Sequence, residues 1–266
     1  MKLFKSFPVL LGLALSLSAT ACGSVSSSPD PVIRTLAPTG SLQIAVYQGS
    51  PTSLVRGSAD GEARGVAVDL GRAMATSLGV ASELVEFQNN ADALLAVKEG
   101  RADFAFTNAT PARARDMDFS PPVLAAEQGY LVPRDSPLAS AASVDKQGVR
   151  VGVVRGSSSE RELARLLKFA TIVPVPSLKD ASKLLADGGL DAFATNKAIL
   201  FELSDGIPGS RVLPGNYGRE AFAIGVPKGR ESGLPWLRRF VEDAKTNGTV
   251  ARAIERAGLR GVTTPD

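Results

Sequence analysis

Apolar and polar positions become regular at Ser41 and then alternate between short strands and amphipathic helices. "LQIAVY" is an apolar run of strand length, and "VDLGRAMATSLG" has helical spacing, with Asp69 as the predicted N-cap and Gly79 as the C-terminal stop. "SELVEFQ", "NADALLAVKEG" and "ADFAF" then predict a strand, a helix capped by Asn90 and a buried strand. This β-α-β-α-β order is typical of a mostly parallel sheet flanked by helices.

The same order begins again near Val149. The second series consists of "VRVGVV", "SERELARLLKFA", "TIVPV", "SLKDASKLLADGG" and "DAFA". Each series ends in a similar phrase, "DFAFTN" in the first and "DAFATN" in the second. Binding sites in such sheets lie beyond the carboxyl ends of the strands, so we expect Asn108 and Asn196 to face one another across a cleft between two lobes.

Two further strands are predicted to cross between the lobes. "GYLVPRDSP" leads into the second lobe, "EAFAIGVPKG" returns from it, and the final helical stretch then completes the first lobe. The predicted fold is an α/β two-lobed clamp, with residues 41–132 and 221–266 as lobe 1 and residues 133–220 as lobe 2. A double hinge of this kind closes on a ligand, as in binding proteins.

The N-terminal stretch has the plan of an export signal. Lys2 and Lys5 precede an apolar run from Phe7 to Leu17, and small residues follow before Cys22. The run is too short to span a bilayer comfortably. "SATACGS" resembles a bacterial lipoprotein box, which implies a signal peptide over residues 1–22, lipidation of Cys22 and a flexible tether over residues 23–40. A plain secretory signal with a chance cysteine is the alternative.

Composition narrows the function without naming it. Hydrophobic residues make up 44% of the 266 residues and charged residues 21%, which is typical of a folded domain with a sizeable core. The net charge of +3 comes with no clustered Lys/Arg tract, so nucleic acid is not an expected partner. Histidine is absent, which excludes histidine-based catalysis and histidine metal sites. No metal or cofactor is expected.

In addition, the chain resembles the family 3 extracellular solute-binding proteins that serve bacterial ABC importers, especially those for polar amino acids. The similarity lies in "GVAVDLGRAMATSLGV", "GRADFAFTNATPARARDMDFSPPV", "VRVGVVRGSSSERELARLL" and "FVEDAKTNGTVARAIERAG", and runs from about Ser41 onward. The resemblance implies a two-lobed clamp, often lipid-anchored, located in the periplasm or otherwise outside the cytoplasm. Its partners would be a small-molecule solute and an ABC permease in the inner membrane.

The resemblance also implies ligand-binding residues. Thr110 is a predicted helix N-cap, Pro111 takes the first helical position, and the family uses this Thr and Arg113 to grip a ligand carboxylate. In lobe 2, Ser157 and Ser158 lie in a turn from which family members contact the same carboxylate, and Arg155 would line its mouth. Ser159 and Glu162 are predicted to form a capping box.

Departures from the family pattern bear on specificity. Asn196, after Thr195, stands where amino-acid binders usually have an Asp that pairs with the α-ammonium group. Because a buried unpaired charge is costly, this argues against a zwitterionic amino acid. The first loop offers Ser50 and Ser53 in place of aromatic residues, with Tyr47 as a possible substitute. Small polar or anionic solutes therefore fit best, either amino-acid-like or organic acids.

Four functions stay open at this stage. The leading hypothesis is a solute receptor for an importer, with no chemistry of its own. A prephenate-type dehydratase on the same fold would need a general acid, for which Glu160 is the candidate. A ligand sensor or scaffold would keep the clamp without transport. A clamp for a larger or more apolar solute is the fourth.

Overall fold

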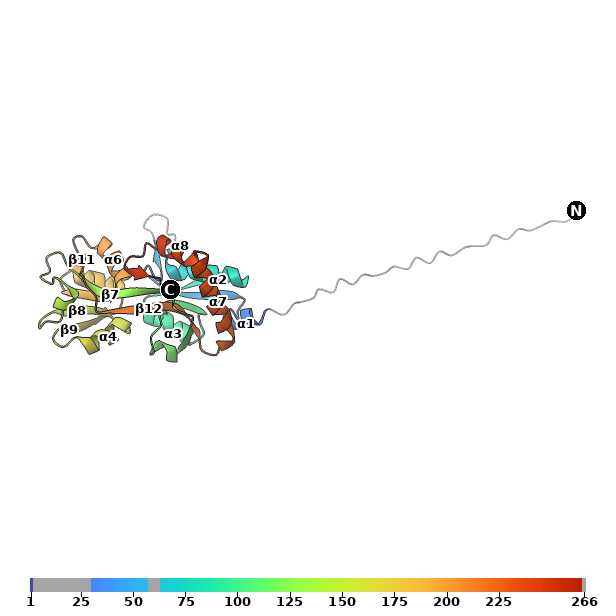
Figure 1. Cartoon of the computed structure of the whole chain (residues 1–266), viewed down its shortest axis with the longest axis horizontal. Coiled ribbons are helices and arrows are strands. Elements are labelled where there is room, and N and C mark those ends of the chain that lie inside the picture. The colour runs from blue at the N-terminus through green and yellow to red at the C-terminus, as the bar shows by residue number, and fades with distance from the viewer. Residues whose placement is uncertain (2–29, 57–62, 265–266) are drawn as a thin grey trace.

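The structure of this chain is a computed structural model that describes residue 1 and residues 30–56 and 63–264. Two lobes lie side by side and are joined by long strands in the middle of the molecule (Figure 1). Residues 2–22 of the predicted signal peptide, including Cys22, and residues 23–29 of the predicted tether lie outside the described residues. Among the residues described, none of the helices combines the length and the apolar character that crossing a bilayer requires.

One sheet runs through both lobes. Along its main path the strands are β4 (Ala81–Phe87), β1 (Ser41–Tyr47), β5 (Phe104–Asn108), β12 (Gly218–Pro227), β7 (Leu124–Val132), β10 (Ala192–Asn196), β8 (Arg150–Val154) and β9 (Thr171–Val175). Off this path, β6 (Met117–Phe119) pairs with β12, while β11 (Arg211–Val212) and β13 (Val262–Thr263) pair with β7. A separate hairpin joins β2 (Val55–Arg56) and β3 (Ala63–Arg64).

The strand directions show how two parallel units become one sheet. β1 lies parallel to β4 and β5 in one lobe, and β8 lies parallel to β9 and β10 in the other. Between them β7 and β12 pair antiparallel, with Glu220 opposite Ala126. These are the two predicted crossing strands, and the prediction is confirmed. β12 pairs with β5 and β7 pairs with β10, so the inner edge of each parallel unit is covered.

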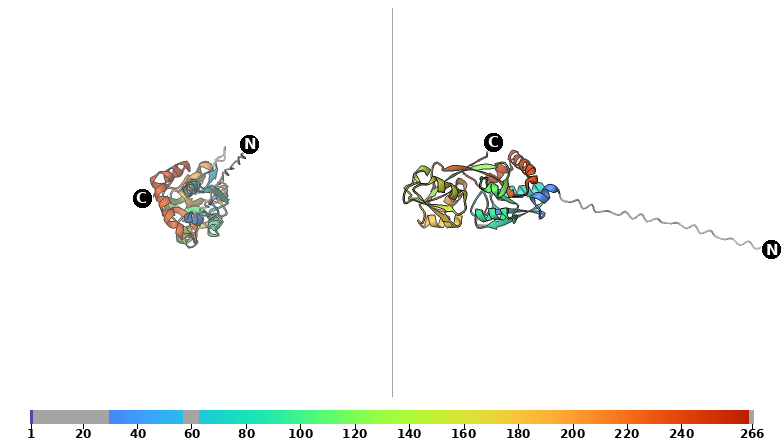
Figure 2. Two further views of the ribbon diagram at one scale, coloured as in Figure 1. Left: turned by 90° about the vertical axis from the view of Figure 1, so that its right-hand side faces the viewer. Right: turned by 90° about the horizontal axis from the view of Figure 1, so that it is seen from below.

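Helices cover the faces of the sheet (Figures 1 and 2). They are α1 (Pro31–Leu36), α2 (Val66–Leu78), α3 (Asn90–Lys98), α4 (Ser158–Leu166), α5 (Leu178–Ala186), α6 (Lys197–Gly206), α7 (Leu234–Thr246) and α8 (Thr249–Arg256). Single 3-10 turns are η1 (Arg113–Arg115), η2 (Ala141–Ser143) and η3 (Glu231–Gly233). The sequence did not predict α6, which begins directly after β10.

Two predicted helix caps are wrong. Helix α2 begins after Gly65 rather than at Asp69, because its first backbone N–H groups, those of Val66 and Ala67, donate to the carbonyl oxygens of Pro51 and Thr52. Asp69 instead lies in the first turn of α2. Helix α3 is capped by Asn89, whose side chain accepts a hydrogen bond from Asp92 N, rather than by Asn90. The predicted stop at Gly79 is confirmed by its left-handed φ of 71°.

The prediction of a flexible tether as far as residue 40 is wrong for its last part. Residues 31–36 form α1, capped by Asp30, whose carboxylate accepts a hydrogen bond from Val32 N. Leu36 at the end of α1 is fully buried in the core of the adjoining lobe. Burial of one leucine side chain contributes about 1.5–3 kcal/mol to holding this segment against the lobe.

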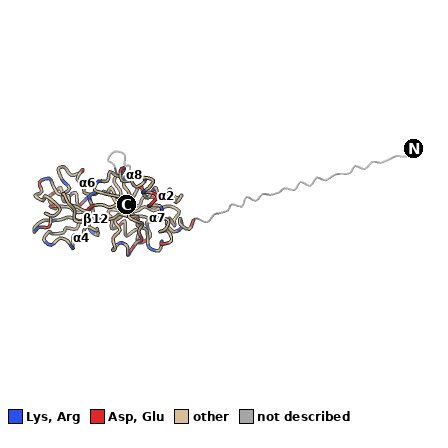
Figure 3. The backbone as a smooth tube through the Cα atoms, in the orientation of Figure 1, with Lys and Arg blue, Asp and Glu red and all other residues tan. Residues whose placement is uncertain are grey.

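The two lobes touch each other. One core cluster draws residues from both, including Tyr47 of β1 and Leu178 of α5. At another contact, a Cβ added at Gly156 would lie 3.2 Å from the Cβ of Ala91, so the backbone of one lobe closely approaches α3 of the other. The cleft between the lobes is therefore narrow where these segments meet. Basic and acidic residues are found on both lobes (Figure 3).

Candidate functional site

A small chamber lies between the lobes, at the carboxyl ends of the parallel strands. Its volume is about 40 Å³. It collects most of the predicted site residues, namely Tyr47, Asn108, Arg113, Arg155, Ser157, Ser158, Thr195 and Asn196. Asn108 at the end of β5 and Asn196 at the end of β10 both line it, as the repeated phrase predicted. The chamber also contains residues that the sequence did not single out, among them Gln88, Glu220 and Phe222.

Arg113 is the buried cation of this chamber, with 7% of its surface exposed. Its Nη1 donates hydrogen bonds to Thr107 Oγ1 at 2.6 Å and to the carbonyl oxygen of Asn108 at 3.2 Å. Burial lowers the pKa of Arg113 to about 10, so the group is still charged at neutral pH. Within the described residues no carboxylate forms an ion pair with Arg113, and Nε and Nη2 make no hydrogen bond. A free guanidinium edge of this kind can bind an anion.

The segment before Arg113 is shorter than predicted. Thr110 Oγ1 does accept a hydrogen bond from Arg113 N, at 3.3 Å, but the turn continues only as the three-residue η1. The expected helix with Pro111 at its first position is therefore wrong, and no helix N-terminus lies here. Thr110 lines a neighbouring, wider cavity instead of the chamber.

The second-lobe turn contributes a helix N-terminus, shifted by two residues from the predicted cap. Ser157 is the N-cap of α4, with its Oγ accepting from Glu160 N at 3.1 Å, and Glu160 Oε2 accepts from Gly156 N at 2.6 Å. The predicted capping box of Ser159 and Glu162 is wrong. Ser159 is buried and its Oγ accepts a hydrogen bond from the hydroxyl of Tyr217 at 2.9 Å.

Asn196 has a local structural role at the wall of the chamber. Its Oδ1 accepts a hydrogen bond from Ile199 N at 3.1 Å, which makes it the N-cap of α6. Thr195 precedes it at the end of β10 and is half-buried. The next residue, Lys197, turns away from the chamber and forms an ion pair with Glu127 at 2.5 Å. Lys197, the charged residue next to Asn196 in the sequence, is therefore neutralised by Glu127 outside the chamber.

In the first loop, the serines that we predicted to bind ligand form hydrogen bonds with neighbouring protein groups instead. Ser53 Oγ accepts a hydrogen bond from Tyr47 N at 2.9 Å, and the Tyr47 hydroxyl donates to Ser50 Oγ at 3.3 Å. Ser50 is also hydrogen-bonded to Thr52 at 2.8 Å. Ser50 and Ser53 are fully buried and line neither cavity, so the prediction of direct ligand contact is wrong for both. Tyr47 lines the chamber, and burial raises its pKa.

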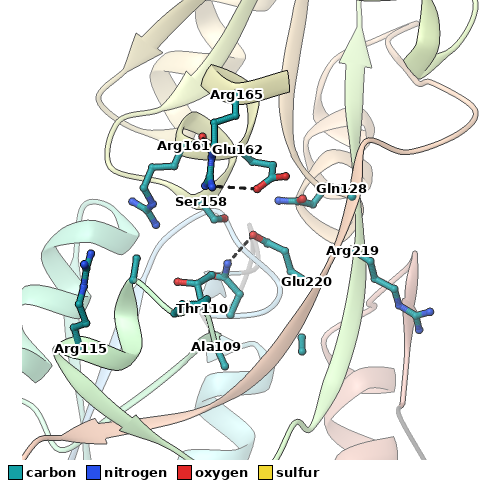
Figure 4. Close-up of a pocket in the computed structure, with 15 residues that line it drawn as sticks. Ala109, Thr110, Arg115, Gln128, Ser158, Arg161, Glu162, Arg165, Arg219 and Glu220 are labelled. Carbon is teal, nitrogen blue, oxygen red and sulfur yellow. Dashed lines mark hydrogen bonds and ion pairs between the residues drawn. The ribbon is translucent and has the colours of Figure 1, made fainter. Parts of the chain in front are cut away.

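A second cavity of about 580 Å³ adjoins the chamber. The two cavities share Asn108, Ser158 and Glu220 as wall residues. Arginines from both lobes surround the wider cavity, and the side chains of Arg115 and Arg161 extend toward one another across it (Figure 4). A ligand larger than the chamber would extend past Glu220 into this space.

Glu220 is the functional candidate that sequence reasoning missed. It lies on β12 and its Oε1 accepts a hydrogen bond from Asn108 Nδ2 at 2.6 Å (Figure 4). Burial raises the pKa of its carboxyl group, while the hydroxyl of Ser158 and the charge of Arg113 lower it. Strand alternation could have found it, because Glu220 shares a face of β12 with the buried Phe222. Glu160, the sequence candidate for a general acid, lines neither cavity.

Comparison with known families agrees with this geometry. The sequence profile of bacterial extracellular solute-binding proteins, family 3, matches residues 42–258, which is most of the chain. The chain belongs to this family. The resemblance inferred from the sequence is thereby confirmed, together with a solute-binding role outside the cytoplasm, which the family's name states.

Individual relatives share less than a third of their aligned residues with this chain. The chain is 29% identical over 119 residues to a glutamine-binding protein of Geobacillus stearothermophilus, covering 45% of each chain. It is 26% identical over 139 residues to the glutamine-binding protein of a Bacillus subtilis ABC transporter, covering 52% of this chain and 50% of that protein. The chain thus matches about half the length of these curated relatives. Both are binding proteins by name, not enzymes.

Solved structures confirm the fold. An ancestral arginine-binding protein bound to glutamine matches with a TM-score of 0.74 and 25% identity, covering 81% of this chain and 96% of that one. A substrate-binding protein of an amino-acid ABC transporter from Streptococcus pneumoniae, bound to L-arginine, matches with a TM-score of 0.76 and 24% identity, covering 85% and 97%. The predicted periplasmic-binding-protein clamp is correct.

Proposed function

We propose that this protein is the substrate-binding component of an amino-acid ABC importer and captures its solute in the interlobe chamber. The observation that carries this proposal is the free guanidinium edge of Arg113, buried at the carboxyl ends of the strands. A solute carboxylate would bind there, since a planar guanidinium fork matches a carboxylate. The named relatives, which are amino-acid-binding proteins, support the same substrate class.

The opposite wall supports an anion in the same place. The N-terminus of α4, with the Ser157 and Ser158 hydroxyls, lines the chamber from lobe 2. Its unpaired backbone N–H groups and the positive end of the helix dipole favour negative charge. A carboxylate held between Arg113 and this helix end would join the two lobes. Lobe 1 would comprise residues 41–132 and 221–266, and lobe 2 residues 133–220, so that hinge bending at β7 and β12 encloses the solute.

Lipidation of Cys22 would hold the protein at the membrane beside its permease. The proposal rests on the N-terminal sequence alone, where the apolar run and small residues precede Cys22. Expression of the full chain with Cys22→Ser in a bacterial host tests it. We expect the wild-type protein in the membrane fraction and the variant in the soluble fraction. Equal release of both proteins would contradict lipid anchoring.

Titration calorimetry with the twenty L-amino acids tests the binding function. We expect at least one to bind, and Arg113→Ala to weaken it about 30-fold or more, since loss of one partner of a buried charge pair costs about 2–5 kcal/mol. Arg101→Ala is the matched control, because this arginine is exposed and lines neither cavity. Equal losses in both variants would point to general electrostatics instead of a carboxylate site. No binding to any amino acid would overturn the amino-acid assignment.

A further inference from the structure

Glu220 is held at the centre of the molecule by contacts to both lobes. It belongs to the returning hinge strand β12, accepts its 2.6 Å hydrogen bond from Asn108 of β5, and lies close enough to the Ser158 hydroxyl of α4 for that group to lower its pKa. It also forms part of the wall shared by the chamber and the wider cavity. Any solute that extends from Arg113 toward the wider cavity must therefore pass this carboxylate.

The partners of Glu220 inside the protein are neutral. An amide and a hydroxyl face it, and within the described residues no lysine or arginine forms an ion pair with it. Arg113 and Arg161 act on it only through space, as nearby positive charges. A partly buried carboxylate without a directly paired counter-ion is unfavourable, and a cationic group of a ligand would relieve that cost.

A second hinge residue supports a polar ligand at this place. Gln128 on β7 is 3% exposed, lines the wider cavity, and its Nε2 is without a hydrogen-bond partner in the described part of the chain. Its amide lies over Gly218, where an added Cβ would be 2.5 Å from Gln128 Oε1. The side chains of Gln128 and Glu220 both point into the space between the lobes (Figure 4). A buried, unpaired donor beside a cavity calls for a ligand acceptor.

We propose that Glu220 binds the ammonium group of the solute and that Gln128 donates a hydrogen bond to an acceptor on its side chain. This deepens the proposed function and rests on it, since Arg113 would hold the carboxylate of the same molecule. The substrate class is then an α-amino acid with a polar side chain that extends toward the wider cavity. The absence of an acid at position 196 does not exclude a zwitterion, because the hinge strand supplies the carboxylate.

The test compares amino acids with their analogues that lack the amino group. L-Glutamine is paired with 4-carbamoylbutanoate, L-glutamate with glutarate, and L-arginine with 5-guanidinopentanoate, in titrations of the wild type and Glu220→Gln. We expect the wild type to prefer an amino acid over its analogue, and Glu220→Gln to weaken the amino acid about 30-fold or more while the analogue changes by less than about threefold. Glu202→Gln, which removes a carboxylate that is paired with Arg64 and lines neither cavity, is the matched control.

The outcomes separate this proposal from the proposed function. If an amino acid binds and Glu220→Gln leaves its affinity unchanged, the assignment of Glu220 is overturned while amino-acid binding stands. If only glutarate or another analogue binds, both the ammonium site and the amino-acid assignment fail. If none of the six binds, methylammonium is titrated as the bare cationic group. A wild-type thermal shift that Glu220→Gln abolishes supports the cation site, and identical behaviour of the two proteins overturns it.

Discussion

Asn196 caps helix α6, with its Oδ1 accepting a hydrogen bond from Ile199 N at 3.1 Å. The same side chain lines the chamber, so local helix chemistry and ligand chemistry meet at one residue. We expect Asn196→Ala to lower the free energy of unfolding by about 1 kcal/mol, the usual cost of a lost N-cap. Asn196→Asp should lose less, because Asp caps equally well and only its charge near Glu220 is unfavourable. Urea unfolding measures both, and an unchanged stability of Asn196→Ala would show that the cap contributes little.

Asn196→Asp should also change specificity. The new carboxylate would add a negative charge to a chamber that already contains Glu220. We expect the affinity for L-arginine to rise relative to that for L-glutamate, since like charges repel inside a cleft. Competition binding with the two amino acids measures the ratio. A ratio that stays at the wild-type value would place the ligand side chain away from Asn196.

Arg113→Met should separate stability from binding. Burial lowers the pKa of Arg113 to about 10, which shows that the charged form is held in an unfavourable environment before ligand binds. Replacing such a buried charge by an apolar side chain of similar length should raise the free energy of unfolding by about 1 kcal/mol. Amino-acid binding should be lost. Thermal unfolding without ligand checks the first effect, and a lower midpoint would mean that Arg113 mainly holds the β5 loop.

The ligand-free protein should lose stability as pH rises above the range of an ordinary carboxyl group. Because burial raises the pKa of Glu220 above the ordinary range of a glutamate carboxyl group, the folded state binds its proton more tightly than the unfolded state. The loss of folding free energy that comes from ionising this buried carboxyl group is absent below about pH 4.5 and complete above the pKa of the folded state. Unfolding at pH 4 to 8 should therefore show a smaller decline for Glu220→Gln than for the wild type. Parallel curves for the two proteins would contradict a raised pKa.

Removal of α1 should destabilise the domain. A chain that begins at Ser41 lacks Leu36, which is fully buried against the core of the adjoining lobe, whereas a chain that begins at Asp30 keeps it together with the cap. We expect the shorter chain to be less stable by about 2–5 kcal/mol, the range for deletion of a buried leucine side chain. Chemical unfolding of the two chains measures this. Equal stability of the two chains would show that α1 contributes nothing to folding, as the prediction of a flexible tether up to residue 40 implied.

The sequence determined the repeated strand-helix pattern and the position of the cleft, because both follow from local periodicity. Short β-rich apolar runs such as Ser41–Tyr47 favour buried strands, and strand ends in a parallel sheet fall at one edge, which brought Asn108 and Asn196 to the same chamber. Arg113 was found by its family motif, and the structure places it in that chamber.

Only the tertiary structure decided which polar side chains are left for a ligand. Ser53 and Asn196 accept hydrogen bonds from nearby backbone N–H groups, and Ser50 is hydrogen-bonded to the hydroxyls of Tyr47 and Thr52. Glu220 lies about a hundred residues from its partner Asn108 in sequence, and only the pairing of β12 with β5 brings them together. Long-range strand pairing is invisible to local periodicity, so the charge balance of the chamber could not be predicted.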